Sequence, residues 1–220
     1  MAMISFERVS KKYSSGHEAL SNVNFTLESG EMAFLTGHSG AGKSTLLKLI
    51  LLLERSSQGQ VMVNDQRLSD LGRHQIPAHR RSIGTVFQNH RLLFDRTVFD
   101  NVALPLQISG YDPQDAARRV RAALDKVGLL PKERMNPQQL STGEQQRIGI
   151  ARAIVNKPKI LLADEPTGNL DPYLSEEIMR LFMEFNRHGT TVLIASHDLA
   201  LVRRMPCRLL TLEQGKLIRG

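Results

Sequence analysis

The sequence predicts an α/β fold in which helices cover a parallel sheet. Three short apolar runs have the pattern of strands that are buried on both faces, which is typical of parallel sheets. They occupy residues 32–35, 159–165 and 191–195, and a helical pattern follows each of them. The runs at residues 2–8 and 23–28 instead alternate apolar and polar side chains. We therefore expect an antiparallel β subdomain beside the parallel core.

Further elements follow from local patterns along the chain. Strands are expected at residues 60–64 and 83–87, and a hairpin at 209–213 and 216–219. Residues 166–171 are expected to form a turn before a helix at 172–187, which ends at Gly189. A short helix that reaches Arg204 is expected between the strand at 191–195 and this hairpin.

No strand pattern occurs between residues 89 and 136, so an inserted helical subdomain is expected there. Residues 98–108 are apolar, and Asp112-Pro113 is a helix cap followed by proline at the first helical position. That helix ends at Gly128. We expect one domain over residues 1–220, in which 1–88 and 158–220 form the α/β core with its β subdomain. Residues 89–157 form the helical subdomain, including a helix that opens in 138–147 and reaches Val155.

The motif with the clearest chemistry is the glycine-rich stretch FLTGHSGAGKSTLLKLIL at residues 34–51, which has the spacing of a phosphate-binding loop. Glycines permit backbone conformations that turn successive N–H groups toward phosphate oxygens, and the following helix adds its positive end. Lys43 would reach the β- and γ-phosphates, and the Ser44 hydroxyl would bind Mg²⁺. The loop residues expected at the nucleotide are Gly37, His38, Ser39, Gly40, Ala41, Gly42, Lys43, Ser44 and Thr45.

Polar side chains stand at the carboxyl ends of three expected strands, where α/β sheets place their ligands. Gln88 follows residues 83–87, and His197 follows the strand at 191–195. Asp164 and Glu165 end the strand at 159–165. We expect Asp164 to bind Mg²⁺ or its water and Glu165 to face an attacking water. Taken alone, Gln88 is explained better as a surface residue.

The segment QQLSTGEQQR at residues 138–147 opens a second capped helix. Ser141 and Glu144 satisfy the capping-box pattern, and small residues at this end would admit a ligand closely. An ordinary well-capped helix explains the same pattern.

The composition is that of an ordinary globular protein, with 41% hydrophobic and 23% charged residues. A single cysteine, no signal-peptide pattern and no apolar run near the ~20 residues that span a bilayer together predict a cytoplasmic protein. The formal charge is +7, but the basic residues are dispersed and no aromatic platform accompanies them. An anionic membrane surface or a solvated face is therefore favoured, and no nucleic acid is expected as a partner.

The phosphate loop, the strand-end glutamine, the LSTGE-type capped helix, the LLADE strand and the strand-end histidine occur here in one order. In this respect the chain resembles ABC-type ATPases over nearly all of its 220 residues. The resemblance implies a P-loop NTPase core of ABC type, ATP hydrolysis as the reaction, and ATP and Mg²⁺ as the bound species.

The resemblance also implies residue roles. Tyr13 would stack on adenine, while Lys43 and the rest of the loop hold the triphosphate. Ser44, Gln88 and Asp164 would hold Mg²⁺. Glu165 would be the catalytic base, and His197 would contact the γ-phosphate. The residues that act across a dimer interface, on the nucleotide of a second copy, would be Ser141, Thr142, Gly143, Glu144 and Asp171.

The number of phosphate-binding helix ends in the sequence also indicates a dimer. One phosphate loop already supplies a monomer's anion site, so a second helix terminus needs a phosphate from another copy, and a symmetric homodimer supplies two composite sites. Two departures from the family pattern stand out. Thr142 replaces a usual glycine, which restricts backbone approach to phosphate. Residues 51–53 lack the glycine that often ends this helix.

Within the family, the phrases RLLFDRTVFDNVALPL and FNRHGTTVLIASHD resemble the ATPases of bacterial cell division. That branch implies an integral membrane partner, control of septal peptidoglycan hydrolases, and contact with the cytosolic division machinery. We expect the partner to bind near residues 89–99, and the protein to lie on the cytoplasmic face of the inner membrane.

Other branches remain as alternatives. Lipoprotein-releasing and macrolide-export ATPases share several of these phrases, and a solute-import ATPase would differ mainly in its partner. DNA-repair ATPases are less favoured, because they usually carry long coiled-coil or zinc-binding insertions and one cysteine cannot build a zinc site.

Overall fold

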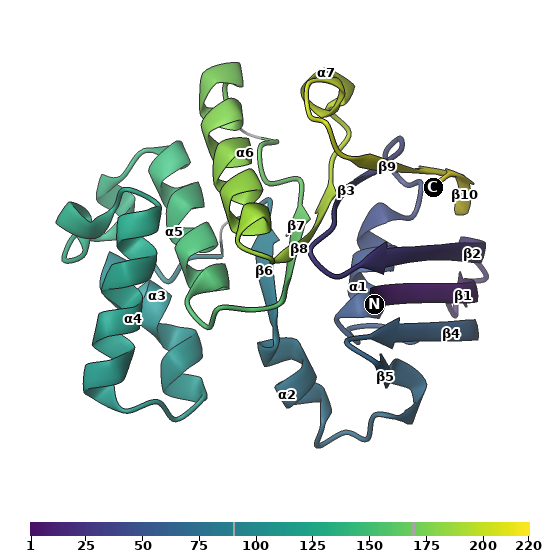
Figure 1. Cartoon of the computed structure of the whole chain (residues 1–220), viewed down its shortest axis with the longest axis horizontal. Coiled ribbons are helices and arrows are strands. Elements are labelled where there is room, and N and C mark those ends of the chain that lie inside the picture. The colour runs from purple at the N-terminus through teal and green to yellow at the C-terminus, as the bar shows by residue number, and fades with distance from the viewer. Residues whose placement is uncertain (90, 169) are drawn as a thin grey trace.

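The computed structural model of the chain describes residues 1–89, 91–168 and 170–220, and it confirms the expected α/β architecture. A parallel-rich sheet lies between a small antiparallel sheet on one side and a layer of helices on the other (Figure 1). Apolar side chains form two cores, one on each face of the larger sheet. Among the described residues, no helix combines the length and apolar character needed to cross a membrane.

The antiparallel sheet has the strand order β2-β1-β4-β5. Its strands are β1 (Ala2–Lys12), β2 (Glu18–Glu28), β4 (Gln58–Val63) and β5 (Gln66–Arg67). The alternation seen in the sequence turns one face inward, where the rings of Phe6 and Phe25 stack with centroids 4.8 Å apart. This face packs on the helix of the phosphate loop and so supports it.

The larger sheet has the order β10-β9-β3-β8-β7-β6. Its strands are β3 (Met32–Thr36), β6 (Ile83–Phe87), β7 (Ile160–Asp164), β8 (Thr191–Ala195), β9 (Arg208–Glu213) and β10 (Lys216–Arg219). All neighbours pair in parallel except β9 and β10. The register aligns Phe87, Asp164, Ala195 and Leu35, so four strands end together at one edge.

The helices begin and end close to the expected residues, except for a short one at Ile76–Arg81 that was not expected. They are α1 (Lys43–Ile50), α2 (Ile76–Arg81), α3 (Val98–Ile108), α4 (Pro113–Lys126), α5 (Thr142–Ile154), α6 (Pro172–Arg187) and α7 (Leu199–Arg203), with 3-10 turns at Leu68–Asp70, Leu130–Lys132 and Pro137–Gln139. The described residues between 91 and 157 form helices and no strand. Asp112 caps α4 by accepting hydrogen bonds from Gln114 N and Asp115 N, as its position before a proline suggested.

Helix α2 was missed, because its short sequence IPAHRR has no apolar periodicity. Its side chains donate hydrogen bonds to carbonyls at the C-terminal end of α1, the helix of the phosphate loop. His79 donates from Nε2 to Ile50 O (2.7 Å), and Arg80 donates to Leu51 O (3.0 Å) and Leu52 O (2.7 Å). Leu52 has a positive φ of 51°, in the stretch where the sequence lacks a glycine to end this helix. Burial of its side chain offsets the strain of that backbone conformation.

We predict that Arg80→Met lowers the free energy of unfolding by about 1 kcal/mol, because two helix-end carbonyls lose their donor. Urea unfolding measures the change. The neighbouring exposed Arg81→Met is the matched control and should unfold like wild type. Equal stability of the two variants would contradict a capping role for Arg80.

Candidate nucleotide-binding site

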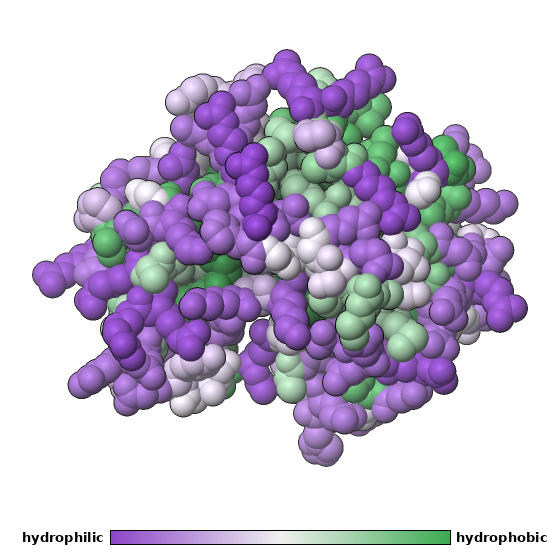
Figure 2. Space-filling model, in the orientation of Figure 1, coloured by the Kyte–Doolittle hydropathy of each residue, from purple (hydrophilic) through white to green (hydrophobic). Residues whose placement is uncertain are grey.

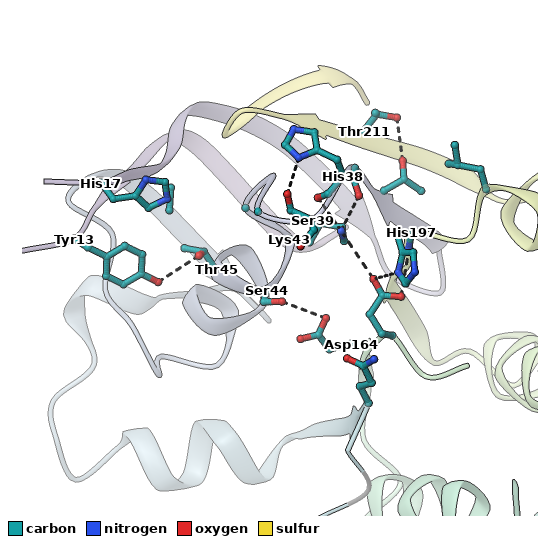
Figure 3. A pocket seen from close by; sticks show the side chains of 18 residues that line it. Tyr13, His17, His38, Ser39, Lys43, Ser44, Thr45, Asp164, His197 and Thr211 are labelled. Carbon is teal, nitrogen blue, oxygen red and sulfur yellow. Dashed lines mark hydrogen bonds and ion pairs between the residues drawn. The ribbon is translucent and has the colours of Figure 1, made fainter. Parts of the chain in front are cut away.

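A cavity of about 970 Å³ opens at the edge where the parallel strands end (Figure 3). The phosphate loop forms one wall, and the ends of β6, β7 and β8 form the other. The predicted residues that line it are Tyr13, Gly37, His38, Ser39, Gly40, Gly42, Lys43, Ser44, Thr45, Gln88, Asp164, Glu165 and His197. Ala41 is the one loop residue expected at the nucleotide that does not line the cavity, because its side chain is buried beneath the loop.

Steric constraints explain two of the loop glycines. Gly37 and Gly42 have positive φ angles of 148° and 110°. A Cβ on Gly37 would lie 2.3 Å from Leu212 O, and one on Gly42 would lie 2.6 Å from Ala19 O. Gly42 also precedes α1 without any side-chain hydrogen bond at the helix start. The first N–H groups of α1 are therefore available to an anion.

Lys43 is buried and bends back over the loop. Its Nζ donates to Gly37 O (2.7 Å) and His38 O (3.2 Å), and lies 3.9 Å from Glu165 Oε1. The ammonium thus points toward the space that the loop encloses. A phosphate entering this space would meet a positive charge that is already partly desolvated, which strengthens their attraction.

Glu165 stands where β7 gives way to a turn, with a positive φ of 49°. Its N–H donates to Ala195 O (2.9 Å), so the neighbouring strand fixes the backbone. His197 Nδ1 lies 2.9 Å from Glu165 Oε1, and His197 N donates to Oε2 (3.3 Å). Figure 3 shows the imidazole turned toward this carboxylate. A positioned carboxylate beside a phosphate site can accept a proton from an attacking water.

Ser44 and Asp164 form the candidate Mg²⁺ site. Ser44 donates from Oγ to Asp164 Oδ1 (3.4 Å), and the Gln88 amide lines the same cavity. Burial raises the pKa of the Asp164 carboxyl, and the hydrogen bond from Ser44 partly opposes that rise. Mg²⁺ prefers oxygen ligands, so a hydroxyl, a carboxylate and an amide oxygen suit this ion.

Tyr13 lies just after β1, at the entrance of the cavity. Its hydroxyl forms a hydrogen bond with Thr45 Oγ1 (3.3 Å), and Lys11 Nζ lies 4.9 Å from the centre of its ring. The ring is thereby fixed against the start of α1, beside the loop that would hold the phosphates. This placement suits an aromatic contact with the base of a nucleotide.

Sequence reasoning missed several residues that line the cavity. They are His17, Ala19, Thr36, Leu199 and Thr211. His17 could have been suspected, because it closes the turn that carries Tyr13. Thr211 gave no signal, because it reaches the cavity only through the pairing of β9 with β3, far away in the sequence.

The residues expected to act from a second copy are not among those that line the cavity: Ser141, Thr142, Gly143, Glu144 and Asp171. Ser141 caps α5 in a capping box with Glu144, and Asp171 caps α6 through Leu174 N (3.0 Å). Lys132 beside Glu144 lowers the pKa of that carboxyl. The tip of α5, Ser141-Thr142, is exposed and is therefore open to another molecule.

Comparison with known proteins establishes the family. The family model described as ABC transporter matches residues 20–168, which include the phosphate loop, α5 and the strand that ends in Asp164. The chain belongs to the ABC transporter family, and it is an ATP-binding and ATP-hydrolysing enzyme of that family.

Its relatives include proteins named Cell division ATP-binding protein FtsE. The chain is 60% identical to that of Escherichia coli K12 over 218 residues, which cover 99% of this chain and 98% of the relative. The protein of Haemophilus influenzae is 56% identical, over 98% of this chain and 99% of the relative. That of Bacillus subtilis is 45% identical, over 99% of this chain and 95% of the relative. The resemblance to the cell-division branch is confirmed.

Two solved structures of similar fold are dimers. One is described as the dimeric structure of MJ0796, a bacterial ABC transporter cassette. Its TM-score is 0.89 and its sequence identity is 37%, and the alignment covers 99% of this chain and 97% of that chain. The other is a dimeric post-hydrolysis state of the same cassette bound to ADP and Pi, with a TM-score of 0.88 at 36% identity and the same coverage. Both support the expected fold of ABC ATPase type.

We predict that Glu165→Gln binds ATP but hydrolyses it roughly 10²–10⁴-fold more slowly, because the amide cannot accept the proton of the attacking water. Phosphate release and ATP binding, measured on the same preparation, separate the two effects. Near-normal turnover would remove Glu165 from this role.

We predict that Asp164→Asn stabilises the nucleotide-free protein at pH 7, by up to about 1 kcal/mol after solvent screening. The folded protein holds the Asp164 proton more tightly than the unfolded chain does, because burial raises the pKa of this carboxyl. Ionisation therefore costs stability above its ordinary pKa of 3.8. Urea unfolding at pH 7 and pH 5 should show a gain that shrinks toward acid; a gain that grows toward acid would contradict the account.

Proposed function

We propose that this chain is the ATPase subunit of a membrane-bound cell-division complex and acts as a homodimer. The observation that carries the proposal is the separation of the site into two parts. The cavity holds the phosphate loop, while the exposed cap of α5 lies apart from it. The full-length identity to cell-division ATPases supports the biological role.

The proposed chemistry starts with the phosphate loop and Lys43, which hold the triphosphate and draw charge from the γ-phosphate. Bound Mg²⁺ would neutralise phosphate charge, with Ser44, Gln88 and Asp164 as the residues that hold it. Glu165 accepts the proton of the attacking water. His197, 2.9 Å from that carboxylate, fixes its orientation and stands beside the phosphate site.

The dimer completes the site by placing the cap of α5 from the partner over the nucleotide. Ser141 supplies a hydroxyl, and the start of α5 supplies N–H groups for a phosphate. Gly143 is buried against Leu174 of α6, where a Cβ would come within 3.1 Å of that side chain. Asp171 caps the same helix, α6, so the α5 terminus and Asp171 belong to one packed unit.

A substitution of Thr142 tests the proposed contact between α5 and the partner's nucleotide, because this branched side chain lies at the exposed tip of α5. We predict that Thr142→Gly allows closer approach to phosphate, and so gives equal or faster hydrolysis and a tighter ATP-dependent dimer. Sedimentation in the Glu165→Gln background measures the dimer. Glycine costs the helix about 1 kcal/mol or less, so a large loss of both properties would show that Thr142 makes a contact of its own.

The membrane partner is proposed to be of FtsX type and to bind near residues 89–99; His90 lies outside the described residues. Leu92 and Val98 are buried, Leu93 and Phe99 are half-buried, and Phe94 is 45% exposed. Apolar surface beyond what the core needs is thus concentrated at Phe94. Arg91 lies over the Phe87 ring (4.3 Å) and could meet acidic groups of the partner or of the lipid. Such a surface fits a helix from a cytoplasmic loop of the partner, which would place the protein on the cytoplasmic face of the inner membrane.

We predict that Phe94→Glu abolishes membrane recruitment and leaves filamentous cells, while the purified variant still binds ATP. Ile218→Glu is the matched control, because Ile218 is also exposed but lies on β10. Fractionation and cell length provide the measurements. Normal septation with Phe94→Glu, or co-purification of the wild type with a solute permease, would contradict the proposal.

A further inference from the structure

Cationic side chains from different parts of the sequence line one groove. This groove lies near the amino ends of the strands, opposite the edge that carries the nucleotide cavity. The groove, about 680 Å³ in volume, lies beside the segments that enter β7 and β8 at their amino ends. It is lined by five Lys or Arg side chains and one carboxylate, a net charge of +4 in a protein whose formal charge is +7. The cations are Arg118, Arg119, Lys126, Lys157 and Lys159.

These cations come from two separate segments, α4 and residues 157–159, and most of their charge is not neutralised. Arg118 pairs with Asp115, and Arg119 lies over the Tyr111 ring (4.8 Å). For Lys126, Lys157 and Lys159 the structure shows no ion pair with any described residue, and all three are exposed. The result is a local positive field that attracts an anionic ligand.

The floor of the groove is apolar. Ile154, Val155 and Phe185 line the groove together with the cations, and Lys126 Nζ is 6.0 Å from the centre of the Phe185 ring. Figure 2 shows apolar surface recessed among hydrophilic side chains over α4, α5 and α6. A ligand that fills the groove therefore gains both charge pairing at the walls and burial of apolar groups at the floor.

We propose that this groove binds an acidic peptide segment in which carboxylates alternate with apolar side chains. The carboxylates would pair with Lys126, Lys157 and Lys159, and the apolar groups would reach Phe185. A flat lipid surface would touch the rim and leave the floor empty, and a free phosphate would use only the cations. The nucleotide cavity lies at the opposite ends of the strands, so binding needs no nucleotide.

The test uses full-length protein and a fluorescein-labelled peptide built from the repeat Asp-Leu-Glu-Phe, with a Ser-for-apolar peptide for comparison. The groove variant combines Lys126→Glu, Lys157→Glu and Lys159→Glu. The control variant combines Arg73→Glu, Lys216→Glu and Arg219→Glu, which change the net charge equally at exposed positions away from the groove. Fluorescence anisotropy measures affinity without nucleotide, and ATP hydrolysis checks that each variant is folded.

We expect saturable binding to wild type that is about tenfold or more weaker for the groove variant and within about twofold for the control. The Ser-containing peptide should bind more weakly, and added salt should reduce binding.

If charge reversal impairs folding, the same positions changed to Gln serve instead, and a photo-crosslinker in the peptide should mark α4, 154–159 and 188–190. Equal affinity of the groove and control variants, or crosslinks elsewhere, would overturn the proposal. So would groove-dependent binding of phosphatidylglycerol vesicles or inorganic polyphosphate without binding of the peptide.

Discussion

The in-register parallel pairing of β3, β8, β7 and β6 is the constraint on which the site depends. It aligns the ends of four strands, so that Gln88, Glu165 and His197 face the phosphate loop although they are far apart in the sequence. Buried apolar side chains on both faces of the sheet fix this register, because a slip of one residue would move side chains from one core to the other and disrupt the packing of both. The same register directs the amino ends of β7 and β8 away from the nucleotide, where the cationic groove lies.

Electrostatic preorganisation explains what the site can do. Lys43, His197 and Glu165 form one contiguous group of charged and polar side chains, with Glu165 between the other two. In a partly dehydrated cavity these contacts hold the side chains in place before substrate arrives, so little reorganisation is needed during reaction. Helix α2 also helps to hold the phosphate loop in place, because His79 and Arg80 bind the C-terminal end of α1.

Much of this arrangement could be predicted from the sequence, because each element has a strong local signal. Buried runs predicted the central strands, and helix 172–187 was predicted at its exact bounds from the proline that opens it and the glycine that follows. Features that depend on tertiary contacts could not be predicted. Helix α2 has no periodicity, Thr211 reaches the cavity only through strand pairing, and three segments far apart in the sequence line the groove. The trans role of Ser141 and Asp171 needs a second chain, so it stays a prediction.

The central claim is that a working site combines Lys43 of one copy with Ser141 of another. It is tested most directly by mixing two inactive variants, Lys43→Ala and Ser141→Arg, and measuring ATP hydrolysis. A mixed dimer contains one site in which both residues are intact, so an equal mixture should recover about a quarter of wild-type activity if the copies exchange freely. No recovery from copies shown to exchange, or an active Ser141→Arg variant on its own, would contradict the account.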